Sequence, residues 1–144
     1  MTDRFRKGFD PIQHGLLRTL YGDLVPPVQM LVVRPGLYRV VDHMFANLGR
    51  LSDRRSLRVA RVESRNAGFL QVVTTGGARG ADDIISITED EARHTCEHCG
   101  KPARLVVKVG LEALLTTPEI ELGDRLLCTD CAHEFQKEIA HDDR

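Results

Sequence analysis

Two Cys-x-x-Cys pairs, Cys96/Cys99 and Cys128/Cys131, contain every cysteine of the 144-residue chain. A Cys-x-x-Cys turn holds two sulfur atoms on one side of a tight loop, and two such loops supply four thiolates for a tetrahedral Zn²⁺ site. The sequence therefore predicts that these four residues bind one structural Zn²⁺. Four cysteines fill the coordination shell, so no position is left for the water of a catalytic zinc. Redox-active dithiols or unpaired thiols are the alternatives.

The sequence around both pairs is typical of a zinc ribbon. Gly100 follows the first pair, where the loop often needs a residue with positive φ. Short apolar strands are predicted at 105–109 and 125–127, and a helix is predicted at 132–141. The 28 residues between the pairs exceed the common spacing of roughly 15–20, so 111–123 is interpreted as an insertion.

Three histidines lie close to the cysteines in sequence: His94, His98 and His133. Any of them could replace a cysteine, because Zn²⁺ also accepts imidazole nitrogen. Since four cysteines already have suitable spacing, we expect the histidines to lie at the surface or beside the site.

Helical periodicity and β-branched runs predict the elements that come before the site. Apolar residues recur at helical spacing in 11–21 and in 37–51, and the second segment has one continuous apolar stripe. Segments 57–63 and 69–75 flank the turn residues 64–68, which predicts an antiparallel hairpin against the second helix.

A third helix is predicted at 82–95, after a glycine-rich connector. Its start is ambiguous, because Thr88 and Glu91 also fit a capping box that would leave 83–87 as a strand. Together these elements predict an α+β fold: N-terminal helices packed on an antiparallel β-hairpin, with a C-terminal zinc ribbon. We expect a helical and hairpin region at 1–80, with an adaptable lead over its first ten residues. A helix and ribbon module at 81–144 then joins it in one compact unit.

Charge is distributed unevenly along the chain, although the formal net charge is only −1. Residues 1–80 contain 13 Lys and Arg against 6 Asp and Glu, whereas residues 81–144 contain 7 against 15. The two halves can attract each other within the fold, or the basic half can present a surface to an acidic partner. The near-zero total by itself predicts neither a nucleic-acid nor a membrane partner.

Six arginines form the densest basic stretch and are candidates for partner binding: Arg50, Arg54, Arg55, Arg58, Arg61 and Arg65. If 57–63 is a strand, alternation places Arg58 on one face and Arg61 with Arg65 on the other, so one flat phosphate-binding stripe is not expected. Only Phe69 is near enough to stack on a base. Contact with a protein, contact with nucleic acid and a merely solvated surface all stay open.

No arrangement of nucleophile and base indicates an enzyme once the cysteines are assigned to metal, so we expect no catalysis. Segment 76–80 lacks the Lys-Ser/Thr of a phosphate-binding loop, and Asp82 with Asp83 would repel a phosphate there. No apolar run is long enough to span a membrane and no signal-peptide core follows the N-terminus, which predicts a soluble, cytoplasmic protein. A reducing compartment favours metal over disulfides at paired Cys-x-x-Cys motifs.

The order of these elements resembles a group of short, uncharacterised bacterial and phage proteins that end in a four-cysteine zinc ribbon. The matching stretches are 35–41 (PGLYRVV), 59–70 (VARVESRNAGFL) and 92–105 (ARHTCEHCGKPARL), and the similarity covers about residues 35–135. This chain departs from the group in its longer linker between the cysteine pairs and its less aromatic strand pair. The resemblance implies the architecture and the metal; the group has no settled activity, so it implies no function.

Two functional classes follow from the sequence. The first is a non-catalytic zinc protein that acts by binding another protein, such as an adaptor, an inhibitor or an immunity-type protein from a mobile element. The second is a nucleic-acid-binding or transcription-regulatory protein that uses the arginines of 50–65. A zinc ribbon is compatible with both classes, so the metal alone does not choose. Scarce aromatics and the acidic C-terminal half favour the protein-binding class.

Overall fold

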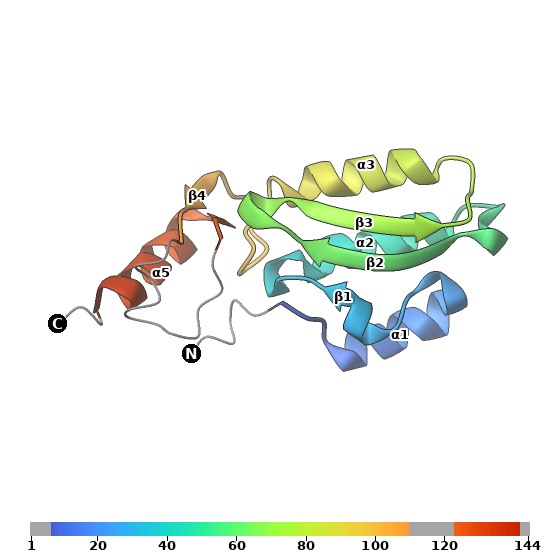
Figure 1. The fold of residues 1–144 in the computed structure, drawn as a ribbon, viewed down its shortest axis with the longest axis horizontal. Helices are drawn as coiled ribbons and strands as arrows, with labels where there is room; N and C mark the ends of the chain where they lie inside the picture. The colour runs from blue at the N-terminus through green and yellow to red at the C-terminus, as the bar shows by residue number, and fades with distance from the viewer. Residues whose placement is uncertain (1–6, 110–122, 142–144) are drawn as a thin grey trace.

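A three-stranded sheet in the order β1-β2-β3 forms the centre of the larger part of the molecule (Figure 1). The structure, a computed structural model, describes residues 7–109 and 123–141, with side chains as far as residue 137. Strand β1 (Leu31–Val32) runs parallel to β2 (Arg58–Ser64), which pairs antiparallel with β3 (Leu70–Thr75). The predicted hairpin is therefore confirmed, and it gains a short parallel neighbour.

A β-bulge in β2 shifts the pairing register between Val59 and Arg61. The extra residue, Ala60, shifts the alternation of side chains between the two faces by one position. Val59 and Val62 are therefore both buried although they are three residues apart. Arg58 and Arg61 therefore both lie on the outer face of the sheet. The expectation that they lie on opposite faces is wrong, because it assumed uninterrupted alternation.

Helices α2 (Tyr38–Gly49) and α3 (Ala81–Ala92) pack against each other, and α3 lies alongside β3 (Figure 1). The apolar stripe predicted for the second helix is confirmed and forms much of the main core: Leu37, Val40, Val41, Met44, Phe45 and Leu48. The alternative start at Thr88 is wrong, because this residue lies inside α3 and its Oγ1 donates a hydrogen bond to the carbonyl of Ile84 at 2.8 Å.

Helix α1 (Pro11–Tyr21) occupies its predicted range, and the Asp10 side chain caps it by accepting from the Ile12 N–H. Only Leu17 of α1 is buried. The apolar side chains that predicted the helix mostly face outward: Ile12, Leu16 and Leu20 are 77%, 56% and 66% exposed. Helical spacing therefore located the helix correctly but not its buried face.

The residues before α1 are held in place, which corrects part of the expected adaptable lead. Gly8 exchanges two backbone hydrogen bonds with Val33, at 2.9 and 3.1 Å. Phe9 is buried against the ring of Tyr38, with 4.7 Å between the ring centroids. Residues 1–6 of that expectation lie outside the described part of the chain.

The C-terminal part consists of the antiparallel pair β4 (Leu105–Val107) and β5 (Arg125–Leu127), followed by α5 (Thr129–His141). It has its own apolar cluster, to which Val107, Leu127 and Phe135 contribute. Helix α5 begins three residues before its predicted start, so that Cys131 lies in its first turn. The insertion predicted at 111–123 falls, except for Gly123, outside the described residues.

The structure is therefore a mixed α+β fold with small sheets, as the sequence predicted in outline. Helix α3 contributes Ala81 and Ala92 to the main core rather than to the C-terminal cluster. Among the described residues, no helix is both long and apolar enough to span a membrane.

Candidate metal centre

The first cysteine pair lies in a tight loop directly after α3. The N–H of Cys96 donates to the carbonyl of Lys101 at 2.7 Å, and the N–H of Gly100 donates to the carbonyl of Cys96 at 3.1 Å. Gly100 has a φ of 83°, a left-handed conformation that costs glycine little. The prediction for this glycine is therefore confirmed. The loop holds Cys96 and Cys99 on the side that faces the second pair.

The second cysteine pair joins β5 to α5. Cys128 follows the last residue of β5, and its carbonyl accepts from the N–H of Ala132 at 2.9 Å. The N–H of Cys131 is directed at Cys128 Sγ, 3.5 Å away. An N–H aimed at a sulfur favours the thiolate form of that sulfur. The helix start therefore supports a metal-binding role for this pair.

The four sulfur atoms form one cluster. All Sγ atoms of Cys96, Cys99, Cys128 and Cys131 lie within 4.8 Å of one another. Cys99 Sγ and Cys128 Sγ are 3.6 Å apart, far beyond a disulfide bond of about 2.05 Å. Four thiolates around one Zn²⁺, each about 2.3 Å away, would lie about 3.8 Å apart. The cluster thus has the dimensions of a tetrahedral metal site, and its four cysteines could hold a metal ion.

Burial affects the thiols unequally. It raises the pKa of the Cys99 thiol and, together with the neighbouring thiols, that of the Cys131 thiol. Burial acts in the same direction on Cys128, but hydrogen bonds from the Cys131 N–H and the adjacent thiols bring the pKa of Cys128 below its ordinary value. Like charges so close together cannot all form without compensation, so the four-thiolate state requires a cation.

The three histidines have different surroundings. His98 Nδ1 lies 3.3 Å from Cys131 Sγ, so this ring lies beside the cluster. His94 Nδ1 lies 2.9 Å from the carbonyl of Asp90, and His133 is exposed on α5. None of the three belongs to the group of four residues that could share a metal ion among the described parts of the chain.

Glu97, inside the first cysteine loop, connects the cluster to the main core. Its Oε1 lies 3.3 Å from Arg34 Nε, and its Oε2 accepts a 2.6 Å hydrogen bond from the N–H of Leu126. Its backbone N–H donates to the carbonyl of Leu126 at 2.9 Å, and its carbonyl accepts from the N–H of Gly36 at 2.8 Å. One residue therefore joins the cysteine loop, strand β5 and the short turn Pro35–Leu37 that precedes α2.

The surroundings of Glu97 are buried and charged. Arg34, Glu97 and Arg125 are all buried, and the Arg125 guanidinium donates to the carbonyl of Gly123 at 2.8 Å. Burial raises the pKa of Glu97, while the Leu126 N–H and the two arginines oppose that increase. Sequence reasoning missed this network, because a glutamate between two cysteines has the signature of an ordinary surface residue.

Two glycines allow the C-terminal part to approach the main body closely. A Cβ on Gly36 would lie 2.0 Å from the carbonyl oxygen of Cys96, so only glycine fits there. Gly68, at the tip of the β2–β3 hairpin, has a φ of 82° and lies against Leu126. The neighbouring Ala67 N–H donates to the carbonyl of Asp124 at 2.9 Å. Backbone contacts therefore fix how the cysteine cluster sits on the body.

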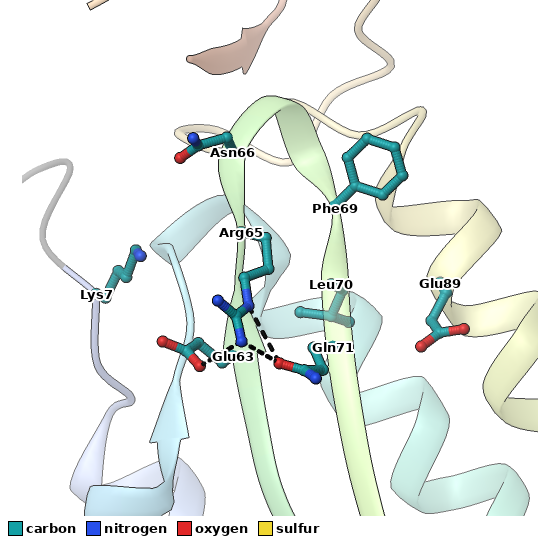
Figure 2. Close-up of a pocket in the computed structure, with 8 residues that line it drawn as sticks. All are labelled: Lys7, Glu63, Arg65, Asn66, Phe69, Leu70, Gln71 and Glu89. Carbon is teal, nitrogen blue, oxygen red and sulfur yellow. Dashed lines mark hydrogen bonds and ion pairs between the residues drawn. The ribbon is translucent and has the colours of Figure 1, made fainter. Parts of the chain in front are cut away.

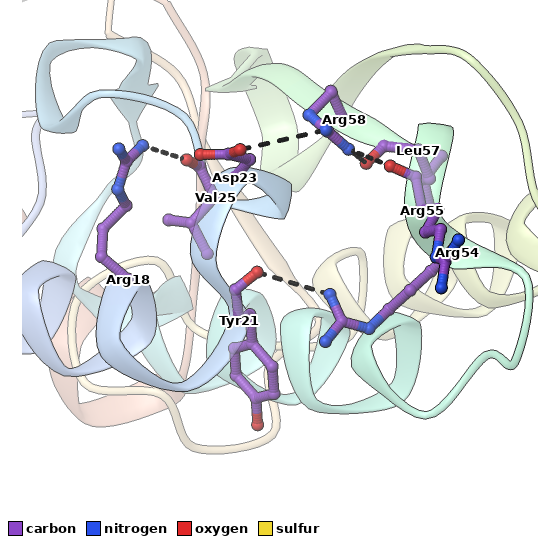
Figure 3. Close-up of polar contacts among 8 residues, drawn as sticks. All are labelled: Arg18, Tyr21, Asp23, Val25, Arg54, Arg55, Leu57 and Arg58. Carbon is purple, nitrogen blue, oxygen red and sulfur yellow. Dashed lines mark hydrogen bonds and ion pairs between the residues drawn. The ribbon is translucent and has the colours of Figure 1, made fainter.

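The arginines proposed for partner binding are divided between separate places. Figure 3 shows one group near the end of α1, where Arg54 Nη1 donates to the carbonyl of Tyr21 at 3.4 Å. Arg58 Nη1 donates to the carbonyls of Arg55 and Leu57 at 2.6 and 2.9 Å, and its Nη2 lies 4.0 Å from Asp23. These arginines support the local backbone.

Arg61 and Arg65 form a second group, farther along the chain from Arg58, and Figure 2 shows Arg65 beside Glu63 and Gln71. Arg61 Nε and Arg65 Nη2 lie 3.4 and 3.6 Å from the same oxygen of Glu63, and Arg65 also donates to the side chain of Gln71. Arg50, at the end of α2, is exposed and belongs to neither group. The six arginines thus make separate local contacts, although Arg58 and Arg61 share the outer face of β2.

Comparisons with protein-family models, with curated proteins and with solved structures found no match to this chain. The resemblance to short bacterial and phage proteins therefore stays a prediction. What the structure contributes is the sulfur cluster, its attachment through Glu97 and the distribution of the arginines.

Proposed function

We propose that this chain is a small, non-catalytic zinc protein that acts by binding another protein. The observation that supports the zinc part of the proposal is the convergence of four cysteine sulfurs within 4.8 Å of one another. The β4–β5 pair and the two cysteine loops support the more specific assignment of a zinc ribbon. In this role the ion stabilises the C-terminal part, and because four thiolates fill its shell it supplies no Lewis-acid chemistry.

Zn²⁺ is favoured over other ions by the donor set. A tetrahedral site of four sulfurs suits Zn²⁺ or iron, whereas hard ions such as Mg²⁺ and Ca²⁺ prefer oxygen ligands. Protein purified without chelator should contain one zinc per chain by elemental analysis and no iron. Its four thiols should resist a thiol reagent until the ion is removed. Absence of zinc, or four freely reactive thiols in the native protein, would refute the metal assignment.

Protein binding is favoured over nucleic-acid binding by the arrangement of the arginines. Arg54 and Arg58 donate to backbone carbonyls. Arg61 and Arg65 both pair with the carboxylate of Glu63. A phosphate would have to compete with these contacts. Among the described residues Phe69 is the exposed large aromatic ring, and the guanidinium of Arg93 already lies over it, 5.5 Å from its centroid. The exposed apolar side chains of α1 are more suitable for a protein partner than for a phosphate backbone.

The partner class is tested by affinity purification of the zinc-loaded chain from its native host, in parallel with and without nuclease treatment. The proposal expects a stoichiometric protein that survives the nuclease, as an adaptor, an inhibitor or an immunity-type protein would give. Recovery of nucleic acid, with proteins that depend on it, would place the nucleic-acid-binding class first.

A further inference from the structure

The two edges of the three-stranded sheet differ. At the β1 edge, Val33 exchanges two backbone hydrogen bonds with Gly8, so the segment before α1 covers that side. At the β3 edge, β3 forms its backbone hydrogen bonds with β2, and no other described segment forms one with β3. Within the described residues, β3 is therefore the edge whose outward backbone groups have no strand partner, and helix α3 packs beside it.

The hydrogen bonds of the hairpin show which residues of β3 direct their N–H and C=O groups away from β2. The N–H of Arg65 donates to the carbonyl of Phe69 at 2.6 Å, so Phe69 directs its backbone toward β2. Backbone groups of an antiparallel strand alternate between the two sides. Leu70, Val72 and Thr74 therefore direct their N–H and C=O groups away from β2, where a further strand could bind.

The composition of β3 does nothing to protect this edge. Native edge strands usually carry lysine, proline or a bulge that discourages pairing with another chain. The six residues of β3, LQVVTT, include no charge and no proline, and the bulge of this hairpin lies in β2. An uncharged, β-branched edge of this length is suited to accept another strand.

The helix beside this edge is strongly acidic. Helix α3 contains five carboxylates and no Lys or Arg: Asp82, Asp83, Glu89, Asp90 and Glu91. Figure 2 shows Glu89 between α3 and β3, at the side of a shallow hollow of about 610 Å³ where Phe69, Leu70 and Gln71 also lie. Lys7, Glu63, Arg65 and Asn66 line the rest of that hollow. No described residue forms an ion pair with Glu89, whereas Asp90 is paired with Arg93 at 3.1 Å. A basic group beside β3 would thus meet a carboxylate that has no ion-pair partner among the described residues.

We propose that β3 accepts an extended, Lys- or Arg-bearing segment of a partner protein as a fourth strand of the sheet. The inference rests on the proposed protein-binding function and specifies its surface. Backbone hydrogen bonds to Leu70, Val72 and Thr74 supply affinity that is independent of sequence. A basic side chain beside Glu89 supplies selectivity, as in other cases of strand addition to a sheet edge.

The first test is amide hydrogen exchange of the zinc-loaded full chain. In the free protein the amides of Leu70, Val72 and Thr74 should exchange much faster than those of Gln71 and Val73. The probe is the capped peptide acetyl-Val-Lys-Val-Thr-Val-Lys-Val-amide, which should slow the three edge amides at least tenfold. Protection of these amides in the free protein, or no slowing by the peptide, would refute the proposal.

Modified peptides separate the backbone and charge contributions. Two peptides are compared, one N-methylated at the odd positions and one at the even positions, so that each lacks the N–H groups of one edge. The peptide that lacks the N–H groups facing β3 should bind at least tenfold more weakly than the unmodified peptide. Replacement of both lysines by glutamate should abolish binding, because the added charges would face α3. Equal affinity of the lysine and glutamate peptides would show that the acidic helix has no role, and would overturn the assignment of a basic partner.

Matched variants locate the site on the protein. Glu89→Lys should weaken binding of the lysine peptide about tenfold. Asp42→Lys makes the same charge change on α2, where Asp42 faces Gln13 of α1, and should alter affinity less than twofold. Thr74→Pro removes one outward N–H without breaking the ladder and should weaken binding, whereas Thr74→Val keeps that N–H and should not. If both substitutions to lysine in the protein changed the peptide affinity equally, the site beside Glu89 would be refuted.

The natural partner distinguishes failure of this inference from failure of the proposed function. If a host protein binds the wild-type chain and both Glu89→Lys and Thr74→Pro with equal affinity, the β3 edge is not the surface used, while the protein-binding function stands. If Thr74→Pro does not fold, the N-methylated peptides and Glu89→Lys still decide the question.

Discussion

Arg34 and Glu97 form an ion pair between the main body and the cysteine loop, with 3.3 Å between Nε and Oε1 and side-chain exposures of 2% and 0%. The attraction within a buried pair of this kind adds little net stability, because both charges have lost their hydration. Loss of one partner, however, is strongly destabilising. Removing either charge leaves the other in a medium that solvates it poorly.

Glu97→Gln should therefore lower the free energy of unfolding by about 3 kcal/mol, as is typical when one member of a buried pair is removed. The amide oxygen can still accept from Leu126, so the loss comes mainly from the charge left on Arg34. Urea unfolding of the zinc-loaded protein measures the effect. Glu91→Gln, on the exposed side of α3, is the control and should change stability by less than about 0.5 kcal/mol. A similar result for both variants would show that the pair is unimportant.

Gly36→Ala should destabilise the contact between the main body and the cysteine loop. The new Cβ would lie 2.0 Å from the carbonyl oxygen of Cys96 and 2.5 Å from the carbonyl carbon of Glu97, and both are backbone atoms that cannot rotate away. We expect a loss of about 2 kcal/mol or more in thermal or urea unfolding.

Gly15→Ala is the matched control for that change. Gly15 lies inside α1, and a Cβ there would have nothing within 4 Å. Because alanine favours a helix more than glycine does, this variant should be more stable by roughly 0.5–1 kcal/mol. Opposite signs for the two substitutions are expected, and a stabilised Gly36→Ala variant would contradict the close contact.

Cys128→Ser should abolish stoichiometric zinc binding and unfold the C-terminal part, because the binding energy of a structural zinc is largely folding energy. Two-dimensional NMR should show loss of dispersed signals from β4, β5 and α5. His133→Ala is the control and should retain one zinc per chain, because His133 does not belong to the sulfur cluster. Loss of zinc in the histidine variant, or its retention in the serine variant, would require a different set of ligands.

Binding to generic DNA or RNA should be weak or undetectable at about 150 mM salt. Binding that neutralises six or more phosphates weakens by orders of magnitude between about 50 and 200 mM salt. Fluorescence anisotropy with a labelled oligonucleotide measures this. Micromolar affinity that is lost on replacing Arg54, Arg55 and Arg58 by alanine, in a variant that is still folded, would support the alternative function. The folding control matters because Arg54 and Arg58 contact backbone carbonyls.

Alkaline pH should destabilise the protein partly through Tyr38. Burial, with a smaller contribution from the negative charge of Asp10, raises the pKa of Tyr38 above its ordinary value. A group whose pKa is raised by folding contributes stability below its unfolded pKa, near 10, and loses that contribution as pH rises through its folded value. The stability loss between about pH 9 and pH 11 should therefore be smaller in Tyr38→Phe. An equal loss would exclude this contribution.

The elements that depend on local periodicity were predictable. The stripe of α2, the β2–β3 hairpin and the helix at 11–21 all follow from neighbours within a few positions, and the structure contains them at nearly the expected bounds. The four candidate ligands were predictable for a similar reason, because each pair is set by a spacing of three residues. The structure confirms that the two pairs meet, because all four Sγ atoms lie within 4.8 Å of one another.

Features that depend on distant contacts could not be predicted. The pairing of Arg34 with Glu97 has no signature in either local sequence, because each residue alone is typical of a surface. The bulge at Ala60 also left no signal, and it reversed the expected face of Arg58. The exposure of Ile12, Leu16 and Leu20 shows that helical spacing identifies an apolar side without saying what covers it.

The positions of the cysteine pairs have a consequence for chain connectivity. The two pairs lie on either side of segment 110–122, so a shared ion would act as a non-covalent clasp between the ends of that segment. The ion would thus add a second connection between β4 and β5, which already pair as antiparallel strands. The clasp would also make the length of the segment nearly neutral for stability, because closing a longer loop costs only a slowly growing entropy.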